Sequence, residues 1–354
     1  MVAIMKQLMK GNEALAEAAI RSGMKCFFGY PITPQTEISA YLAKNMPKNG
    51  GVFLQAESEV SAINMVYGAA GAGARVMTSS SGPGLSLKQE GISYIAAADL
   101  PCVIVNVMRA APGLGGIQAS QADYFQAVKG GGHGDYHLIV LAPASVQEMA
   151  EMTVTAFNLA DEWRIPVMIL TDGVVGQMME SVDFDRLPKV KEYKKPWAAC
   201  GKNGRKHHNI INTLYLEPEE LEGVIMEREE KYRRIESELQ AWEEFDTDGA
   251  EVFVVAYGIS ARIARSAVKR ARQEGIAVGL IRPKTLYPFP KAAFNRDMKT
   301  VLCVEMSRGQ MLEDVKLTVG DKAKVEFYGR AGGMLVDEDE ILVYIRRCAD
   351  ENNI

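Results

Sequence analysis

Closely spaced cysteines are missing from this chain. No two of its five cysteines form a Cys-X-X-Cys pair. Iron–sulfur clusters and structural zinc sites take several thiolates at short spacing, so we expect neither on this chain. An odd number of scattered cysteines is also typical of a reducing compartment. The five are Cys26, Cys102, Cys200, Cys303 and Cys348.

Long apolar runs and an excess of positive charge are missing as well. No apolar run approaches the roughly 20 residues that a membrane helix needs, and the N-terminus lacks a signal-peptide pattern. The net charge of −5 argues against nucleic-acid binding, which requires a basic face. With 47% hydrophobic and 24% charged residues, the 354-residue chain has a globular composition. We therefore expect a cytoplasmic protein that binds neither nucleic acid nor a membrane.

Residues 1–190 alternate short apolar segments with helical segments. This alternation is typical of a parallel sheet with helices on both faces. Thr33-Pro34 predicts a helix cap followed by proline at the first helical position, and Ser58 and Ser145 predict the caps of later helices. The expected strands cover residues 26–30, 52–56, 74–81, 101–109, 138–142 and 166–173.

The pattern breaks over 191–249 and resumes over 250–354. In the break, residues 217–244 predict one long acidic helix with a narrow apolar stripe. Such an arm either lies across another domain or a partner chain, or is a solvated linker helix. Beyond it, further strands and a helix capped by Ser260 predict a small doubly wound domain. The expected fold class is α/β, with two doubly wound parallel-sheet domains joined by a charged helical arm.

Two polar residues follow the first two strands, where open parallel sheets bind their ligands. Thr33 would offer its hydroxyl to a carboxylate or carbonyl group, although a plain helix cap is the simpler interpretation. Glu59 begins a helix, where a glutamate usually only complements the helix dipole. Small apolar residues follow it, and burial among them would favour its protonated form near neutral pH, as acid–base chemistry requires.

The loops after the next two strands are also candidates. Arg109 ends an apolar strand, where its guanidinium would bind a substrate carboxylate with both arms; a structural salt bridge is the alternative. The preceding loop combines hydroxyls with glycines that would let the backbone approach a flat ligand, yet it matches neither a Walker A nor a dinucleotide-binding motif. That loop includes Ser81, Gly82, Pro83 and Gly84.

Five segments together resemble the α-type subunit of 2-oxoacid:ferredoxin oxidoreductases, particularly the 3-methyl-2-oxobutanoate (2-ketoisovalerate) type. The resemblance covers nearly the whole chain, including the charged arm and residues 282–290. The five segments are Gly29-Tyr-Pro-Ile-Thr-Pro34, Gln55-Ala-Glu-Ser-Glu59, Thr78-Ser-Ser-Ser-Gly-Pro-Gly84, Asn106-Val-Met-Arg109 and Lys129-Gly-Gly-Gly-His-Gly-Asp135.

The resemblance implies a pyrimidine-binding (PYR) thiamine-diphosphate domain in 1–190 and a transketolase C-terminal-like domain in 250–354, joined by the linker and arm of 191–249. It implies that Glu59 hydrogen-bonds N1′ of the cofactor's aminopyrimidine and thereby promotes loss of the C2 proton. Thr33 and Arg109 would contact the 2-oxoacid. A wall facing the cofactor would include Ser81, Gly82, Pro83 and Gly84.

The Gly-Asp-Gly…Asn motif that holds Mg²⁺ and the diphosphate is absent from the sequence. The resemblance therefore implies a β-type partner subunit with the diphosphate-binding domain and Mg²⁺, and γ-type and ferredoxin-like subunits, with the iron–sulfur clusters on partner chains. His133 and His137 lie four residues apart without a supporting carboxylate, so we expect no metal on this chain.

The implied reaction, active only with the partner subunits, converts a 2-oxoacid and coenzyme A to acyl-CoA and CO₂ and passes electrons to external ferredoxin. Three alternatives stay open: 2-oxoglutarate or pyruvate as the substrate, a thiamine-dependent transketolase or dehydrogenase chain, and a non-catalytic scaffold. The joint presence of Thr33, Glu59 and Arg109 speaks against the scaffold, which needs none of them.

Overall fold

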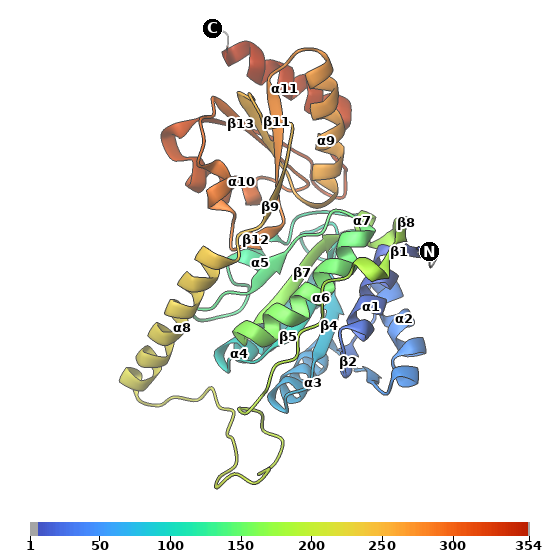
Figure 1. Cartoon of the computed structure of the whole chain (residues 1–354), viewed down its shortest axis with the longest axis vertical. Coiled ribbons are helices and arrows are strands. Elements are labelled where there is room, and N and C mark those ends of the chain that lie inside the picture. The colour runs from blue at the N-terminus through green and yellow to red at the C-terminus, as the bar shows by residue number, and fades with distance from the viewer. Residues whose placement is uncertain (1–5, 353–354) are drawn as a thin grey trace.

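The computed structural model describes residues 6–352, which form two α/β units linked by a long arm (Figure 1). Residues 1–5, part of the N-terminal stretch assessed for a signal peptide, lie outside the described residues. No helix within 6–352 combines the length and the apolar character needed to cross a membrane.

The first unit is built on a seven-stranded sheet in the order β12-β6-β7-β5-β4-β2-β3. Its neighbouring strands run parallel, except that β12 pairs antiparallel with β6 at the edge. The central strands β5 and β7 are buried along their whole length, as their continuous apolar sequences predict. The strands are β2 (Cys26–Gly29), β3 (Val52–Gln55), β4 (Val76–Ser80), β5 (Cys102–Met108), β6 (Ile139–Leu141), β7 (Pro166–Asp172) and β12 (Thr285–Tyr287).

Helices pack on this sheet, with α6 against β5 and β7, and α3 against β2 and β4. The predicted caps at Ser58 and Ser145 are confirmed, because each hydroxyl accepts a hydrogen bond from the backbone N–H three residues later. A small ribbon of β1 (Gln7–Lys10) and β8 (Met179–Val182) lies beside the sheet. The helices are α1 (Gly11–Arg21), α2 (Thr36–Asn45), α3 (Glu59–Gly71), α4 (Pro83–Ala97), α5 (Tyr124–Val128), α6 (Val146–Trp163) and α7 (Gly173–Gln177).

The second unit has a five-stranded sheet in the order β14-β13-β10-β11-β9. Four strands are parallel, and β9 pairs antiparallel with β11 at one edge. The strands are β9 (Trp242–Phe245), β10 (Val252–Val255), β11 (Val278–Pro283), β13 (Thr300–Glu305) and β14 (Lys324–Gly329). The helices are α9 (Gly258–Gln273), α10 (Gln310–Val319) and α11 (Glu338–Asn352).

The arm centres on α8 (Pro218–Glu238), which descends along one side of the first unit in Figure 1. Tyr232 and Ile235 are buried in the common core, and Arg228 Nη2 donates to the carbonyl oxygen of Ala97 at 2.7 Å. The C-terminal half of the arm thus packs against the first unit and is no solvated linker. Toward its N-terminus, α8 exposes apolar side chains such as Met226.

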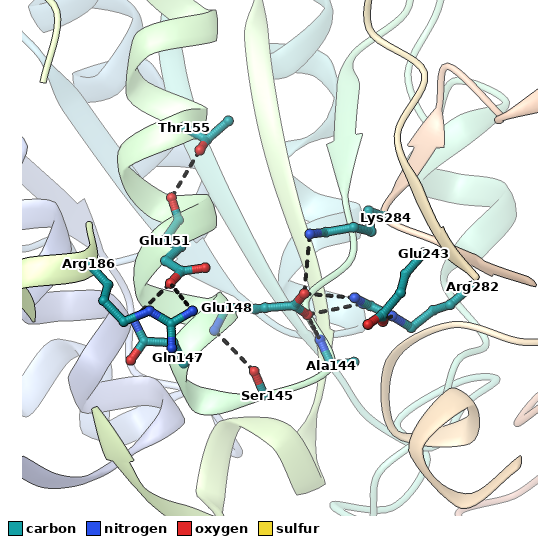
Figure 2. Close-up of polar contacts among 10 residues, drawn as sticks. All are labelled: Ala144, Ser145, Gln147, Glu148, Glu151, Thr155, Arg186, Glu243, Arg282 and Lys284. Atoms are coloured by element: carbon teal, nitrogen blue, oxygen red, sulfur yellow. Dashed lines mark hydrogen bonds and ion pairs between the residues drawn. The ribbon is translucent and has the colours of Figure 1, made fainter. Parts of the chain in front are cut away.

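An ion pair ties the two units together (Figure 2). Arg282 on β11 donates to both carboxylate oxygens of Glu148 on α6, at 2.7 and 3.0 Å, and to Glu243 at 2.8 Å. Burial alone would raise the pKa of Glu148, but the hydrogen bonds and charge of Arg282, the Ala144 N–H and the charge of Lys284 outweigh it, and the pKa is lowered.

Three local predictions were wrong because contacts distant in sequence override the local signals. Helix α2 begins at Thr36, not after Thr33, since the buried Gln35 accepts the Ser79 hydroxyl and donates to the Tyr30 carbonyl oxygen, closing a turn. The acidic helix ends at Glu238, and β9 follows. Ser260 lies inside α9, where its hydroxyl donates to Gln121 of the first unit.

Candidate active site

The candidate site lies at the carboxyl edge of the first sheet. The strands β3, β2, β4 and β5 are neighbours and run parallel, so the loops that follow them gather at one edge. These loops carry the sequence-predicted residues: Thr33, Glu59, Ser81, Gly82, Pro83, Gly84 and Arg109.

Glu59 is the first residue of α3 and is only 6% exposed. No side chain among residues 6–352 donates a hydrogen bond to its carboxylate. By contrast, Glu57 is exposed and accepts a hydrogen bond from the Ser61 hydroxyl. The two glutamates therefore differ, since Glu59 is buried and Glu57 is exposed to solvent.

Gly84 lies directly against the Glu59 carboxylate. A Cβ at Gly84 would come within 2.4 Å of both Glu59 Oε1 and Ser80 Oγ. The turn into α4 also requires Gly82, whose φ of 44° is disfavoured for residues with a side chain. The two glycines bring the backbone of this loop close to the acid.

The hydroxyls of Ser80 and Ser81 are buried and have no hydrogen-bond partner in the part of the chain that the structure describes. Buried polar groups normally find a partner, so unpaired ones invite a ligand that supplies it. Together with the Glu59 carboxylate, which has no donor among residues 6–352, and the close approach of the backbone at Gly84, they fit a flat heterocycle with nitrogen donors and acceptors.

The structure brings Thr33 and Arg109 together, but their contact is made by the backbone of Thr33 and not by its hydroxyl. Arg109 Nη1 donates to the Thr33 carbonyl oxygen at 3.1 Å, and Nη2 donates to the Leu114 carbonyl oxygen at 3.0 Å. Arg109 is 7% exposed, and its buried Nε has no partner within residues 6–352. The arginine thus braces two loops and keeps further N–H groups for a ligand.

Asp123 and Asn106 lie near Arg109, and neither of them was singled out by the sequence analysis. Asn106 Nδ2 donates to Asp123 Oδ2 at 3.0 Å. Burial raises the pKa of Asp123, while Asn106, the Gly82 N–H and the charge of Arg109 oppose that rise. The carbonyl oxygens of Thr33 and Leu114 hold the guanidinium in place, and Asp123 adds a negative charge near it.

Lys88 was also missed, although it lies one helical turn beyond Gly84. It is fully buried on α4, and its Nζ donates to the Thr78 hydroxyl at 2.9 Å. Burial lowers the pKa of Lys88 to about 8, and the negative charge of Glu59 partly opposes this. A single lysine among Leu85, Ile92 and other apolar positions of one helix face was the available signal.

The two histidines of the glycine-rich segment lie apart from this centre. His133 Nδ1 is 3.3 Å from the Ser93 hydroxyl, and His137 stacks on Tyr287 with ring centroids 4.3 Å apart. Among residues 6–352, no group of three or more His, Cys, Asp and Glu side chains is arranged to hold a metal ion.

A separate cavity of about 580 Å³ lies between the two units, around the ion pair of Figure 2. Its lining includes Glu148, Arg262, Arg282 and Lys284, but none of the predicted site residues. This cavity and the candidate site are therefore different places.

Two family models match the chain. Residues 17–245 match "Pyruvate flavodoxin/ferredoxin oxidoreductase, thiamine diP-bdg". Residues 250–341 match "Pyruvate:ferredoxin oxidoreductase core domain II". The first match spans the candidate site and the second spans most of the second unit.

Curated relatives are similar over nearly the full length. The ketoisovalerate oxidoreductase subunit VorB of Methanothermobacter thermautotrophicus is 51% identical, over 98% of this chain and 99% of its own. The 2-oxoglutarate synthase subunit KorA of Archaeoglobus fulgidus is 40% identical, over 91% of this chain and 94% of its own.

Solved structures share the fold. The 2-oxoglutarate:ferredoxin oxidoreductase from Magnetococcus marinus, with 2-oxoglutarate, coenzyme A and succinyl-CoA bound, superposes with a TM-score of 0.88 at 29% identity. The match covers 97% of this chain and 65% of that one. A split gene transketolase, an inactive β4 tetramer, superposes with a TM-score of 0.59 at 15% identity, a likeness of fold alone. The predicted α/β fold class is confirmed.

Proposed function

This chain belongs to the 2-oxoacid:ferredoxin oxidoreductase family, and on that premise we propose that it is the α-type subunit of an enzyme for branched-chain 2-oxoacids. The enzyme converts the 2-oxoacid, with 3-methyl-2-oxobutanoate as the preferred substrate, and coenzyme A to acyl-CoA and CO₂, and reduces ferredoxin. The observation that carries this proposal is the 51% identity to a ketoisovalerate oxidoreductase subunit over 98% of the chain.

The match to a thiamine-diphosphate-binding family model supports thiamine diphosphate as the cofactor. The residues of the candidate site fit the aminopyrimidine part of that cofactor. Bound thiamine diphosphate supplies a nucleophilic carbon for attack on the 2-oxo group and stabilises the negative charge that decarboxylation leaves. We assign the Glu59 carboxyl to a hydrogen bond with N1′ of the aminopyrimidine. The unpaired Ser80 and Ser81 hydroxyls and the close approach at Gly84 support this assignment.

Glu59 would act by holding a proton at N1′, and its burial supports that role. A carboxyl group that is 6% exposed and lacks protein donors is shielded from competing water. We assign Ser81, Gly82, Pro83 and Gly84 to the wall beside it, which would face the aminopyrimidine and keep water out. Diphosphate and Mg²⁺ are assigned to a β-type partner subunit, because the sequence contains no Gly-Asp-Gly…Asn motif.

Arg109 is assigned as the anchor of the 2-oxoacid carboxylate, with the exposed Thr33 hydroxyl beside it. Arg109 is the cation of the loops that follow β2 to β5, while the nearby Lys88 lies within α4 and donates to Thr78. Among residues 6–352, these loops thus offer one cation to a ligand, enough for a substrate with one carboxylate. The exposed Leu114 lies in the loop that Arg109 braces, which suits an apolar substrate side chain.

2-Oxoglutarate is the second candidate substrate, and the observation that favours it is the 40% identity to a 2-oxoglutarate synthase subunit. 2-Oxoglutarate needs a second cation, which would have to come from a partner chain. The native complex, purified with its partners and offered both 2-oxoacids in competition, decides between the two. Isobutyryl-CoA as the main product by mass spectrometry supports the proposal, and succinyl-CoA overturns the substrate assignment.

We also propose the domain boundaries of this chain and the subunits with which it assembles. Relatives are named as subunits, so this chain works in a multi-subunit complex. We assign residues 1–190 to the PYR domain, 191–249 to the linker and arm and 250–354 to the transketolase C-terminal-like domain. The proposed partners are the β-type subunit, a γ-type subunit and a ferredoxin-like subunit that carries the iron–sulfur clusters, in a cytoplasmic complex with external ferredoxin as acceptor.

A further inference from the structure

Lys88 is a buried cation that the proposed chemistry leaves without a role. Its side chain is fully buried on α4, and its Nζ has a hydroxyl, Thr78 Oγ1, as its hydrogen-bond partner at 2.9 Å. Lysines are rarely buried without a carboxylate bound to them. A buried ammonium held by a neutral group therefore calls for an explanation beyond stability.

The geometry places Lys88 and Glu59 in the same interior space. Thr78 and Ser80 are two residues apart on β4 and face the same side of the sheet. Thr78 binds Lys88, while Ser80 and the Glu59 carboxylate both flank Gly84. Gly84 and Lys88 lie one turn apart on α4, so the ammonium and the carboxylate stand along one side of β4.

The helices α3 and α4 close this space. A Cβ at Gly91 of α4 would come within 2.5 Å of the Ile63 side chain of α3, so the two helices touch one turn beyond Lys88 and Glu59. Ile63 and Ile92 are buried there. Because solvent is excluded on that side, the interaction between the two charges is weakly screened.

Few other charges act within this space. The strand β4 contributes only the hydroxyls of Thr78 and Ser80 to this side, and β2 has no charged side chain. On α4, Glu90 points outward and accepts the Tyr94 hydroxyl. On α3, Glu59 is the only charged residue.

The remaining charges are those of Arg109 and Asp123, which lie on the β5 side and act on each other. Arg109 packs on Gly82, and its charge acts on Asp123, which also accepts a hydrogen bond from Asn106. Glu59 is the charge that acts on Lys88, where it opposes the lowering of the lysine pKa by burial. Among the described residues, Glu59 is thus the counter-charge that acts on Lys88 in the closed space.

We propose that Lys88 is a positioning residue for Glu59: its ammonium, anchored on Thr78, faces the Glu59 carboxyl and determines how readily that carboxyl holds a proton. The inference rests on the proposed function, because it assigns Lys88 a role through Glu59. A charged Lys88 favours the carboxylate, and a neutral or missing one favours the carboxylic acid.

The test follows the protonated-carboxyl infrared band of Glu59 against pH in the full chain without cofactor. The band is identified by its loss in Glu59→Gln. In Lys88→Met, which keeps the length of the side chain but removes its charge, the pH at which the band disappears should shift upward. Thr78→Val keeps the lysine but removes its anchor, and it should give a smaller shift in the same direction.

Lys231→Met is the matched control, since Lys231 is a partly buried lysine on α8 that pairs with Asp99 far from Glu59. It should leave the band unchanged. An unchanged band in both Lys88→Met and Thr78→Val overturns the inference. If Lys88→Met fails to fold, Thr78→Val alone decides.

A second measurement separates this inference from the proposed function. In the reconstituted complex we follow the rate of hydrogen–deuterium exchange at C2 of bound thiamine diphosphate against pH. In Lys88→Met this rate should stay high up to a higher pH than in the wild type. If Glu59→Gln exchanges at the wild-type rate, the proposed function fails. If Glu59→Gln is slow but Lys88→Met leaves both band and pH profile unchanged, only the role of Lys88 fails.

Discussion

Gly84 stands so close to Glu59 that a Cβ at position 84 would lie 2.4 Å from Glu59 Oε1, inside the contact distance of the two atoms. The absence of a side chain at Gly84 on α4 therefore determines where the carboxylate of Glu59 on the preceding helix α3 sits. This relationship links the glycine-rich loop to the acid.

Gly84→Ala should displace the Glu59 carboxylate or the Ser80 hydroxyl. A misplacement of about 1 Å at a catalytic group lowers rates by about 10²-fold, so C2 exchange of bound cofactor should fall by roughly that factor in the reconstituted complex. Gly68→Ala on the same helix as Glu59 is the control, because a Cβ there meets no atom within 4 Å. Wild-type exchange in Gly84→Ala would show that the position of Glu59 is not critical.

Arg109→Met should raise KM for the 2-oxoacid while thiamine diphosphate still binds. Loss of a charge-assisted contact to a carboxylate costs about 2–5 kcal/mol, a rise in KM of roughly 30-fold or more. Arg109→Lys keeps the charge but cannot reach the carbonyl oxygens of both Thr33 and Leu114. Its KM should therefore lie between the KM of the wild type and that of Arg109→Met. A KM at the wild-type value in Arg109→Met would make this arginine purely a brace between loops.

Expressed alone, the chain should be colourless, bind thiamine diphosphate weakly and oxidise no 2-oxoacid. The reason is the missing motif for the diphosphate and Mg²⁺ and the scattered cysteines. Isothermal titration, iron analysis and a ferredoxin-reduction assay check these points. Addition of the β-type partner should restore tight cofactor binding, and turnover by the isolated chain would contradict the division of the site between two subunits.

Arg282→Met should destabilise the contact between the two units. Removing one partner of a buried ion pair costs about 3–5 kcal/mol when the other charge is left unpaired, and the Glu148 and Arg282 side chains are 17% and 7% exposed. Lys284 Nζ still lies 3.4 Å from Glu148, so the loss should be smaller than that. Thermal unfolding at neutral pH measures the loss. Arg234→Met, from a pair that is 60% and 49% exposed, should change stability little.

The same pair predicts a dependence on pH. The pKa of Glu148 is lower in the folded chain than its ordinary value, so the stabilisation is present above the ordinary value, near 4.3, and is lost as the pH falls through the folded pKa. The difference in stability between wild type and Arg282→Met should therefore shrink in acid. A difference that is constant from neutral pH to strong acid would exclude Glu148 as its source.

Local sequence predicted much of this molecule because its central strands are continuous apolar runs and its functional loops follow them in chain order. Thus Glu59 and the Ser81–Gly84 turn lie at one edge of the sheet. The antiparallel strands β12 and β9 were missed because each is short and pairs with a strand far away in the sequence.

The polar contacts of the interior were also beyond local reasoning. The turn closed by Gln35 and Ser79 joins residues 44 positions apart, and the Arg109–Thr33 contact joins residues 76 positions apart. The burial of Lys88 depends on how α3 and α4 pack. Spacing along the chain shows which residues share a helix face, but it does not show which charge from another element they meet.

The most direct test of the account is hydrogen–deuterium exchange at C2 of thiamine diphosphate bound to the reconstituted complex, measured in Glu59→Gln and Glu57→Gln. Gln keeps the size of the side chain but cannot hold the proton at N1′, and a positioned acid or base contributes about 10²–10⁴-fold in rate. Exchange should slow by at least that range in Glu59→Gln and stay at the wild-type rate in Glu57→Gln, whose side chain is exposed. Equal exchange in the wild type and Glu59→Gln would contradict the assignment of Glu59.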